Sequence, residues 1–292
     1  MSRDLTTVRD FFRYAVSEFT RAELSFGHGA VNAIDEAAFI VLESLALPID
    51  DINPWLDARL TGDERVRLAD LIRERIEARK PAAYLLNKAY IQGVPFYVDE
   101  RVIVPRSYIG EIIAGGAGAP WNGDNVNSVL DLCTGSGCLA IIAALAFPEA
   151  TVDAVDISGD AIDVARRNVV DHGLSERISL HAGDLFAPVG ARRFDIIISN
   201  PPYVDAQSLS AFPPEYRAEP MIAHAGGDDG LEIVRRILAA APAHLNDGGG
   251  LLCEIGSGRE LLEAAYPRLP FLWIDTQESE GEVFWLARAD FG

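Results

Sequence analysis

The stretch "FDIIISNPPY" at residues 194–203 puts an amide, two prolines and an aromatic ring directly after an apolar run. Proline cannot donate a hydrogen bond to a neighbouring strand and fixes its own φ angle, so Pro201 and Pro202 end the strand and stiffen the backbone that follows. The side-chain oxygen of Asn200 and the carbonyl oxygen of Pro201 then form a pair of acceptors, which suits an NH2 group. The structural alternative is a rigid turn after a strand.

Such a pair of acceptors can activate a planar nitrogen. The lone pair of an amide or exocyclic amine is delocalised, so the nitrogen is a poor nucleophile. Accepting both of its hydrogens favours tetrahedral geometry and stabilises the positive charge that develops as the nitrogen attacks a methyl group. Tyr203 can stack on the planar group and align it. We therefore predict that the catalytic residues are Asn200, Pro201, Pro202 and Tyr203.

A glycine-rich loop and three strand ends predict a nucleoside site. In "VLDLCTGSGCLAIIAAL" the glycines lie between a strand and a helix, where the backbone can approach a ligand closely. Asp156 ends the next strand, 19 residues beyond Gly137, where a carboxylate can accept hydrogen bonds from both ribose hydroxyls. Asp184 and Leu185 end a third strand and can meet an adenine. This pattern fits both NAD and S-adenosylmethionine, but Asp131, inside its strand, favours the cationic S-adenosylmethionine over a pyrophosphate.

The surrounding pattern predicts an α/β fold with a doubly wound, seven-stranded sheet. The last two strand candidates are too close in sequence for a parallel crossover, so we expect them to form an antiparallel hairpin. The other five alternate with helical stretches and are expected to be parallel, with ligands at their carboxyl ends. In chain order the seven are "SVLDLC", "TVDAVD", "ISLHAG", "FDIIIS", "GGLLCEI", "FLWIDTQ" and "EVFWLARA".

The chain divides into three predicted parts. Apolar groups recur at helical spacing over residues 4–80, so we expect a helical bundle domain over residues 1–87. Its charged run "ERVRLADLIRERIEARK" is interpreted as a solvated helix face. Residues 88–104 predict a β-hairpin connector, and residues 105–292 form the α/β domain, in which 114–127 are expected to be a loop.

The composition limits the possible partners. A net charge of −19 argues against a surface that tracks phosphates and would suit a cationic protein partner, although acidity also serves solubility alone. No apolar run approaches the roughly 20 residues that span a bilayer, and the N-terminus lacks a secretory signal. We therefore predict a cytoplasmic protein that does not bind a membrane.

Three cysteines are expected to be reduced thiols. Cys133, Cys138 and Cys253 cannot all pair, and two of them lie in or beside strands that are predicted to be buried. No further cysteine pair or nearby histidine completes a zinc site. We predict no metal.

Several segments together resemble the class I S-adenosylmethionine-dependent methyltransferases. "NPPY" is similar to the subgroup that methylates planar nitrogens, which includes adenine-specific DNA methyltransferases and protein-glutamine methyltransferases. The segments "AVSEFTRAELSFGHGAVNAIDEAAFIVLESLALPID", "GVPFYVDERVIVPRS" and "DLCTGSGCLA" resemble the PrmB family of ribosomal protein glutamine methyltransferases, within the HemK/PrmC-like superfamily. Two positions depart from the family pattern, since Tyr108 stands where proline is expected and His224 where leucine is expected.

This resemblance implies the reaction and its residues. The expected substrate is a glutamine of the third large-subunit ribosomal protein, a basic protein gripped with help from the helical domain and held by Asn200 to Tyr203. Pro105 and Arg106 are expected to cover the site. The residues expected to bind S-adenosylmethionine are Asp131, Cys133, Thr134, Gly135, Ser136, Gly137, Asp156, Ile157, Asp184, Leu185 and Asn200.

Other functions remain open at this point. The PrmC sister family methylates peptide-release factors, and a DNA adenine methyltransferase can share the same motif, although the acidity opposes DNA binding. An NAD-dependent dehydrogenase fits the glycine loop but leaves "NPPY" unexplained. A module that binds S-adenosylmethionine without turnover is a further class. The sequence leaves the oligomeric state open.

Overall fold

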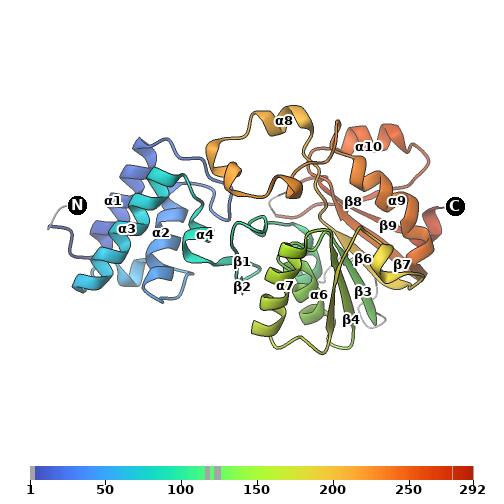
Figure 1. Ribbon diagram of the computed structural model, residues 1–292, viewed down its shortest axis with the longest axis horizontal. Coiled ribbons are helices and arrows are strands. Elements are labelled where there is room, and N and C mark those ends of the chain that lie inside the picture. Colours follow the sequence, from blue (N-terminus) through green and yellow to red (C-terminus); the bar gives the residue numbers. More distant parts are fainter. Residues whose placement is uncertain (1–3, 116–118, 122–125, 278, 292) are drawn as a thin grey trace.

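The computed structural model describes residues 4–115, 119–121, 126–277 and 279–291. A helical part at the N-terminus and a larger α/β part at the C-terminus lie end to end, with a short hairpin between them (Figure 1). A segment with α8 (Ala206–Ser210) arches from the sheet edge back toward the helical part. The two parts are therefore connected at two places.

The described residues of the helical part form four α-helices. Thr7 and Thr61 start two of them with capping boxes, in which the threonine side chain and an acidic side chain three residues later each satisfy a free backbone N–H group. Phe19, Ile40 and Leu68 are fully buried where the helices meet. The helices are α1 (Val8–Arg21), α2 (Ala33–Ser44), α3 (Gly62–Ala78) and α4 (Ala82–Leu86).

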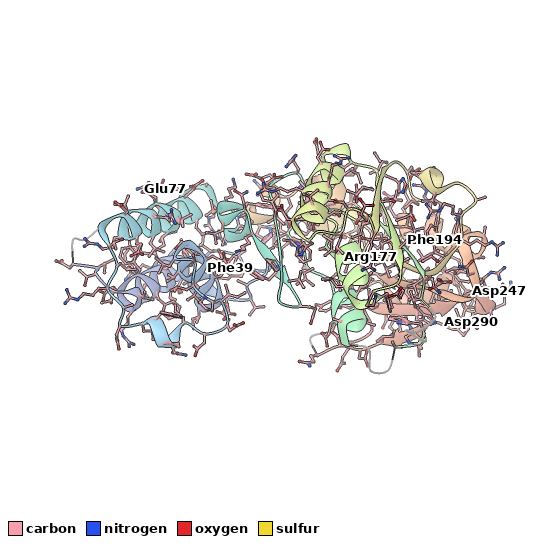
Figure 2. All side chains as sticks on the ribbon, turned by 90° about the horizontal axis from the view of Figure 1, so that it is seen from below. Phe39, Glu77, Arg177, Phe194, Asp247 and Asp290 are labelled. Carbon is pink, nitrogen blue, oxygen red and sulfur yellow. The ribbon has the colours of Figure 1, made fainter. Side chains whose placement is uncertain are left out.

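The charged run on α3 is not only a solvated face, so that prediction was wrong for one residue. Glu77 lies on the outer surface, as expected (Figure 2). Arg75, in contrast, is fully buried and pairs with the buried Glu36 of α2. The alternation of charges in one helix could not reveal this pair, because the acid lies on another helix.

The α/β part confirms the predicted fold class. Its seven strands lie in the order β5-β4-β3-β6-β7-β9-β8, and β9 is antiparallel to both of its neighbours while the first five strands are parallel. The expected final hairpin is thus present. The strands are β3 (Ser128–Leu132), β4 (Thr151–Asp156), β5 (Ile178–Ala182), β6 (Phe194–Ser199), β7 (Leu245–Glu254), β8 (Leu272–Ile274) and β9 (Val283–Ala287).

Helices cover both faces of the sheet, which explains its nearly continuous apolar strands. One core lies between the sheet and α6, and the other lies between the opposite face of the sheet and α9. Phe194 belongs to the second core and is fully buried (Figure 2). The helices of this part are α5 (Ile109–Gly115), α6 (Cys138–Ala146), α7 (Gly159–Asp171), α9 (Glu232–His244) and α10 (Arg259–Ala265).

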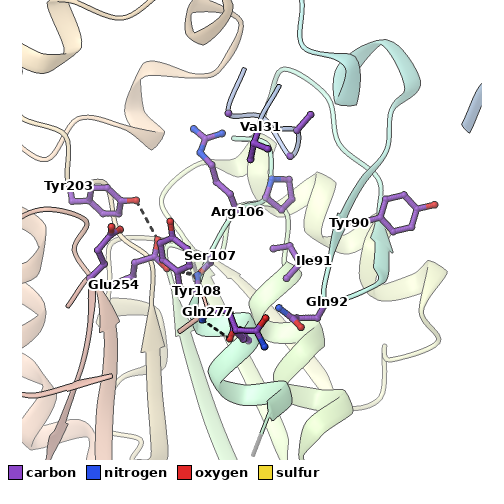
Figure 3. Close-up of a pocket in the computed structure, with 16 residues that line it drawn as sticks. Val31, Tyr90, Ile91, Gln92, Arg106, Ser107, Tyr108, Tyr203, Glu254 and Gln277 are labelled. Carbon is purple, nitrogen blue, oxygen red and sulfur yellow. Dashed lines mark hydrogen bonds between the residues drawn. The ribbon is translucent and has the colours of Figure 1, made fainter. Parts of the chain in front are cut away.

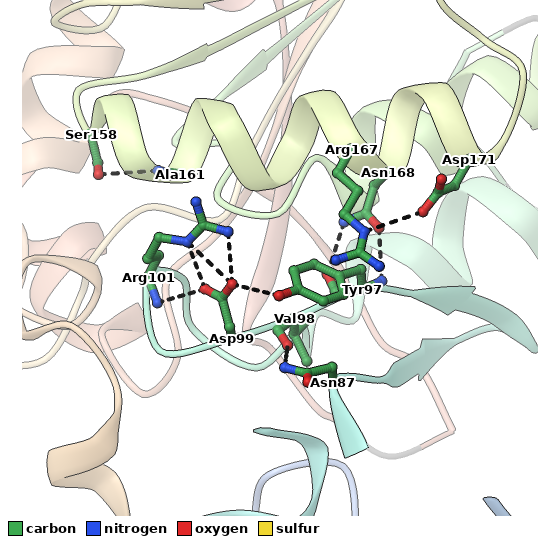
Figure 4. A network of polar contacts seen from close by, with 10 residues as sticks. All are labelled: Asn87, Tyr97, Val98, Asp99, Arg101, Ser158, Ala161, Arg167, Asn168 and Asp171. Carbon is green, nitrogen blue, oxygen red and sulfur yellow. Dashed lines mark hydrogen bonds and ion pairs between the residues drawn. The ribbon is translucent and has the colours of Figure 1, made fainter. Parts of the chain in front are cut away.

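A hairpin of β1 (Ala89–Ile91) and β2 (Val94–Phe96) begins the connection between the two parts. The chain that follows is tied to α7 (Figure 4). Asn168 donates to the Tyr97 carbonyl at 3.0 Å and accepts from the Tyr97 N–H at 2.7 Å, while the Arg167 guanidinium lies 3.4 Å from the centre of the Tyr97 ring. These contacts hold the next residues over the carboxyl ends of the strands.

The predicted loop at 114–127 is described only in part. Helix α5 reaches Gly115, and residues 116–118 and 122–125 of the predicted loop lie outside the described residues. Cys133, Cys138 and Cys253 are free thiols. Within the described ranges, no helix is both long and apolar enough to cross a membrane, and no group of three His, Cys, Asp or Glu side chains could hold a metal ion.

Candidate active site

A cavity of about 180 Å³ lies at the carboxyl ends of four neighbouring strands. The parallel sheet brings these ends to one edge, as the sequence predicted. Pro202 and most residues expected to bind the cofactor line this cavity, namely Cys133, Gly135, Asp156, Ile157, Asp184, Leu185 and Asn200. The others do not line the cavity, namely Asp131 of β3 and Thr134, Ser136 and Gly137 of the glycine loop.

The backbone of the cavity wall is shaped by unusual φ angles. Gly135 has a φ of 55°, which glycine adopts without cost. Cys133 and Leu185 have φ angles of 61° and 46°, which side chains with a Cβ rarely adopt. Strained residues of this kind persist where the surrounding fold holds them, and they cluster at ligand sites. Both of them line the cavity.

Asp156 holds the backbone of the cavity wall and still has lone pairs available for a ligand. Its Oδ2 accepts from the Gly135 N–H at 2.8 Å, and its Oδ1 accepts from the Ser158 N–H at 2.9 Å. Burial raises the pKa of this carboxyl, and the backbone donors oppose that shift. A carboxylate has about four lone-pair positions, so Asp156 can still accept hydrogen bonds from a ligand diol.

Asp131 is fully buried beneath the glycine loop. Its Oδ2 accepts from Thr134 Oγ1 at 2.5 Å and from the Ala140 N–H at 3.1 Å, so it holds the loop and the first turn of α6. Its Oδ1 has no partner in the described part of the chain, and burial raises the pKa of this carboxyl to about 7. A buried acceptor without a partner is unusual, and a proton on this carboxyl near neutral pH would reduce the cost of burying it.

Sequence reasoning missed the cover of this cavity. Arg101 and Ile103 come from the connection between the two parts, and Ile222 comes from the segment that follows α8. Arg236 of α9 pairs with Asp184 at 2.5 Å, so it holds the acid that we expected to meet adenine. These residues are distant in the chain and have no local pattern that predicts them.

The Asn200 side chain is held in one orientation. Its Nδ2 donates to the backbone carbonyl of Arg106 at 3.1 Å. Because a carbonyl can only accept, this contact fixes Nδ2 toward Arg106 and leaves Oδ1 available as an acceptor. Arg106 therefore lies at the site, as expected. Pro201 is buried and lines neither of the cavities beside the motif.

A second cavity of about 560 Å³ lies on the other side of the motif (Figure 3). Tyr203 lines it, whereas Asn200 lines the first cavity. The wall of the second cavity extends beyond the α/β part, because Val31 of the helical part and Tyr90 of the hairpin contribute to it. The Asn-Pro-Pro-Tyr motif thus lies at the boundary between two cavities.

Glu254 is a site residue that the sequence did not reveal. It is the last residue of β7, is almost fully buried, and lines the second cavity. Its Oε2 accepts from Ser107 Oγ at 2.7 Å and from the Tyr108 N–H at 3.0 Å, and its Oε1 accepts from the Tyr203 hydroxyl at 3.3 Å (Figure 3). Its position at the end of a predicted strand was the one feature of the sequence that could have indicated this role.

The ionisation of Glu254 gives a testable pH dependence. Burial raises its pKa from 4.5 to about 7, so the folded protein retains a proton that the unfolded chain releases. The free energy of unfolding should therefore fall as the pH rises from about 4.5 to 7. Glu254→Gln cannot ionise and should remove this contribution, which amounts to at most roughly 3 kcal/mol.

Urea unfolding of both proteins between about pH 5 and 7 measures this effect. The decline of wild-type stability should be steeper than that of Glu254→Gln, and Asp131, present in both, does not affect the comparison. Glu260→Gln on the exposed face of α10 is the matched control and should decline like the wild type. Equal slopes for Glu254→Gln and the wild type would contradict the expectation.

Three glycines allow other segments to pack against the motif. A Cβ on Gly226 would lie 2.7 Å from Tyr203 Cα, and one on Gly230 would lie 2.4 Å from the Tyr203 carbonyl oxygen. A Cβ on Gly256 would lie 2.7 Å from the edge of the Tyr203 ring. The segment "AGGDDGL" therefore supports the backbone of the motif, and Gly256 supports its ring.

Comparison with known proteins identifies the family. The family described as "Methyltransferase small domain" matches residues 122–212. The chain is 58% identical to the ribosomal protein uL3 glutamine methyltransferase of Bradyrhizobium diazoefficiens, over 98% of this chain and 92% of that protein. It is 52% identical to the corresponding enzyme of Bordetella pertussis, over 98% and 96% of the two chains, and 53% identical to that of Burkholderia pseudomallei, over 95% and 93%. The chain therefore belongs to the family of ribosomal protein uL3 glutamine methyltransferases.

Proposed function

We propose that this protein transfers a methyl group from S-adenosylmethionine to the side-chain amide nitrogen of a glutamine in ribosomal protein uL3. The observation that carries the proposal is the position of Asn200. Its amide is oriented by the Arg106 carbonyl at 3.1 Å, and it lines the smaller cavity while Tyr203 of the same motif lines the larger one. The names of the relatives support the substrate.

The residues of the smaller cavity fit the cofactor. Asp156 would accept from the ribose hydroxyls, and Asp184 and Leu185 would meet the adenine. Asp131 does not line this cavity, and it would act indirectly by holding the glycine loop and the first turn of α6. When bound, S-adenosylmethionine supplies an electrophilic methyl group on a sulfonium cation.

Asn200, which lines the smaller cavity, would accept one hydrogen of the substrate amide, and the Pro201 carbonyl would accept the other if the substrate reaches past the cavity wall to this buried residue. This arrangement stabilises the charge that develops on the nitrogen, and because the acceptors are fixed beforehand, no reorganisation is needed during the reaction. Tyr203 would stack on the amide plane from the side of the larger cavity. The methylated amide is acidic enough to lose its extra proton to water or a nearby carbonyl, so no general base is required.

The larger cavity suits a basic polypeptide. Glu111, Glu254 and Glu282 line it, and no lysine or arginine pairs with them in the described residues. Arg106 is the one cation in the described wall, and it is paired with Glu219 at 2.8 Å. Because burial raises the pKa of Glu254 to about 7, the negative charge of this wall near neutral pH comes mainly from Glu111 and Glu282. An unbalanced negative wall attracts a cationic partner and opposes nucleic acid.

The wall continues into the helical part. A neighbouring cavity of about 400 Å³ shares Gly29 and Tyr90 with the larger one and adds Asp35, Asp50 and Asp51. This continuity supports a division of labour, in which residues 1–87 recognise the substrate protein, residues 88–104 connect, and residues 105–292 carry out methyl transfer. Since the relatives are named for a ribosomal protein, we expect the reaction in the cytoplasm.

Charge reversal in the larger cavity tests its role in substrate binding. The double variant Glu111→Lys/Glu282→Lys should raise the KM for uL3 by about tenfold or more, which corresponds to roughly 1.4 kcal/mol, because like charges would then face each other. Glu149→Lys, an exposed site before β4, changes the net charge equally per residue and should leave KM within about twofold. Unchanged KM and unchanged salt dependence in the double variant would contradict the assignment.

Labelling identifies the substrate. The protein is incubated with methyl-labelled S-adenosylmethionine and, in parallel, unmodified uL3, peptide-release factors and DNA, followed by peptide mapping. We expect label on one glutamine of uL3. Label on a release factor alone would assign the protein to the sister activity, and label on DNA would indicate adenine methylation.

A further inference from the structure

We propose that Glu219 is a positioning residue that fixes the catalytic amide of Asn200 through Arg106. The inference rests on the proposed function, because it assumes that Asn200 accepts from the substrate amide. Glu219 lies in residues 204–225, here called the strap, which run from the end of the motif toward the helical part (Figure 1). It is 19 residues beyond Asn200 and lines neither of the cavities beside the motif.

The Glu219 carboxylate holds one short segment at two points. Both of its oxygens accept from the Arg106 guanidinium at 2.8 Å, in a two-pronged contact. Its Oε1 also accepts from the Val104 N–H at 2.8 Å. The carboxylate side chain is fully buried. Charged, two-pronged contacts of this kind are strong and directional, so the backbone from Val104 to Arg106 is fixed relative to the strap.

The fixed segment presents the carbonyl that orients the catalytic amide. The Arg106 carbonyl accepts from Asn200 Nδ2 at 3.1 Å. If Val104 and Arg106 were released from Glu219, this carbonyl could move and Asn200 could rotate its amide. An amide rotated by half a turn would present donors, not an acceptor, to the substrate NH2 group.

The helical part also contacts this carboxylate. His28 Nε2 lies 3.6 Å from Glu219 Oε2, and His224 Nε2 of the strap lies 2.9 Å from the same oxygen. The Tyr216 ring packs nearby, with its centre 4.3 Å from that of His28 and 5.5 Å from the Arg106 guanidinium carbon. Although burial opposes ionisation, the contacts from His224, His28 and Arg106 hold the pKa of Glu219 well below its usual range.

His224, which departs from the family pattern, contacts Glu219 together with His28. The sequence did not predict this role for His224. Both histidines are buried, and their ring nitrogens converge on Glu219 from the two parts of the molecule. The orientation of the catalytic amide is thereby connected to the docking of the helical part. Because Glu219 accepts directly from Arg106, it does more than fill space in the strap.

The experiment compares two buried glutamates of the strap. Glu219→Gln keeps the shape but removes the charge that holds Arg106, and it should lower kcat by about 10- to 100-fold, as expected for a small misplacement of a catalytic group. The KM for uL3 and the Kd for S-adenosylmethionine should stay within about threefold. Glu215→Gln is the matched control, because Glu215 is equally buried and accepts from Arg79 at 2.9 Å and from the Ser25 N–H at 3.1 Å. It should keep kcat within about twofold.

Circular dichroism and thermal unfolding show whether Glu219→Gln folds. If it does not, Arg106→Gln takes its place, since this side chain is 31% exposed and its carbonyl remains. Arg106→Gln should show the same loss of kcat, and the double variant should lose no more than either single variant.

Wild-type kcat in folded Glu219→Gln, or in Arg106→Gln when Glu219→Gln does not fold, would overturn the inference. So would equal losses of kcat in Glu219→Gln and Glu215→Gln. The proposed function fails separately, if the wild-type protein itself does not methylate uL3.

Discussion

Asn200→Ala is expected to lower kcat by about 10²- to 10³-fold, which is the usual cost of removing one fixed polar group that stabilises charge in a transition state. The alanine removes the acceptor for the substrate NH2 group and leaves the Arg106 carbonyl without its donor at 3.1 Å. The Kd for S-adenosylmethionine should change little, because the other cavity residues, including Asp156 and Leu185, remain.

Single-turnover methylation of uL3 and calorimetric titration with S-adenosylmethionine measure the two quantities separately. Asn200→Asp is the isosteric variant, and it should be as inactive as alanine because a carboxylate cannot donate to the Arg106 carbonyl. Asn246→Ala is the matched control, since Asn246 lies in β7 and donates to Asp195 Oδ1 at 2.8 Å, outside both cavities. Undiminished turnover of Asn200→Ala would remove this residue from the mechanism.

Arg75→Met is expected to lower the free energy of unfolding by about 3–5 kcal/mol, because it removes one partner of a buried ion pair. Arg75 pairs with Glu36, donates to the Ser25 carbonyl at 3.0 Å, and lies 3.7 Å from Glu215. Methionine fills most of the space but leaves the buried carboxylate of Glu36 without its cation. Burial already raises the pKa of Glu36 against the effect of Arg75, so this carboxyl would take up a proton in the variant.

Urea unfolding near neutral pH measures this loss in the first transition, which reports the helical part if the two parts unfold separately. Arg73→Ala is the control on the same helix. Its guanidinium is 60% exposed and pairs at 2.7 Å with Asp70, which is 52% exposed, so it should change stability by no more than about 0.5 kcal/mol. A loss below about 1 kcal/mol for Arg75→Met would mean that this pair contributes little to the stability of the helical part.

The convergence of the parallel strand ends at one cavity could be predicted because of a rule of parallel sheets. Strands that run in the same direction end at one edge, so Asp156, Leu185 and Asn200 had to converge once their strands were recognised. The prolines after Asn200 act locally and needed no knowledge of the fold. For the same reason the final antiparallel hairpin followed from the short distance between its strands in sequence.

The supports of the site could not be predicted, because they join residues that are far apart in sequence. The contact between Arg106 and Asn200 spans 94 positions, and that between Arg106 and Glu219 spans 113. Glu254 meets Tyr203 across 51 positions. Polar contacts of this range have no period, so a single sequence does not distinguish their members from solvated charges.

The sequence by itself determined the fold class and the edge of the sheet where the cavity with Asp156 and Asn200 lies, because strand period, proline and glycine act over a few residues. Only the tertiary structure decided that Nδ2 of Asn200 faces the Arg106 carbonyl and leaves Oδ1 free, which carboxylates are buried, and how the helical part reaches the site through His28. These features depend on packing between separate segments, and local patterns carry no record of that packing.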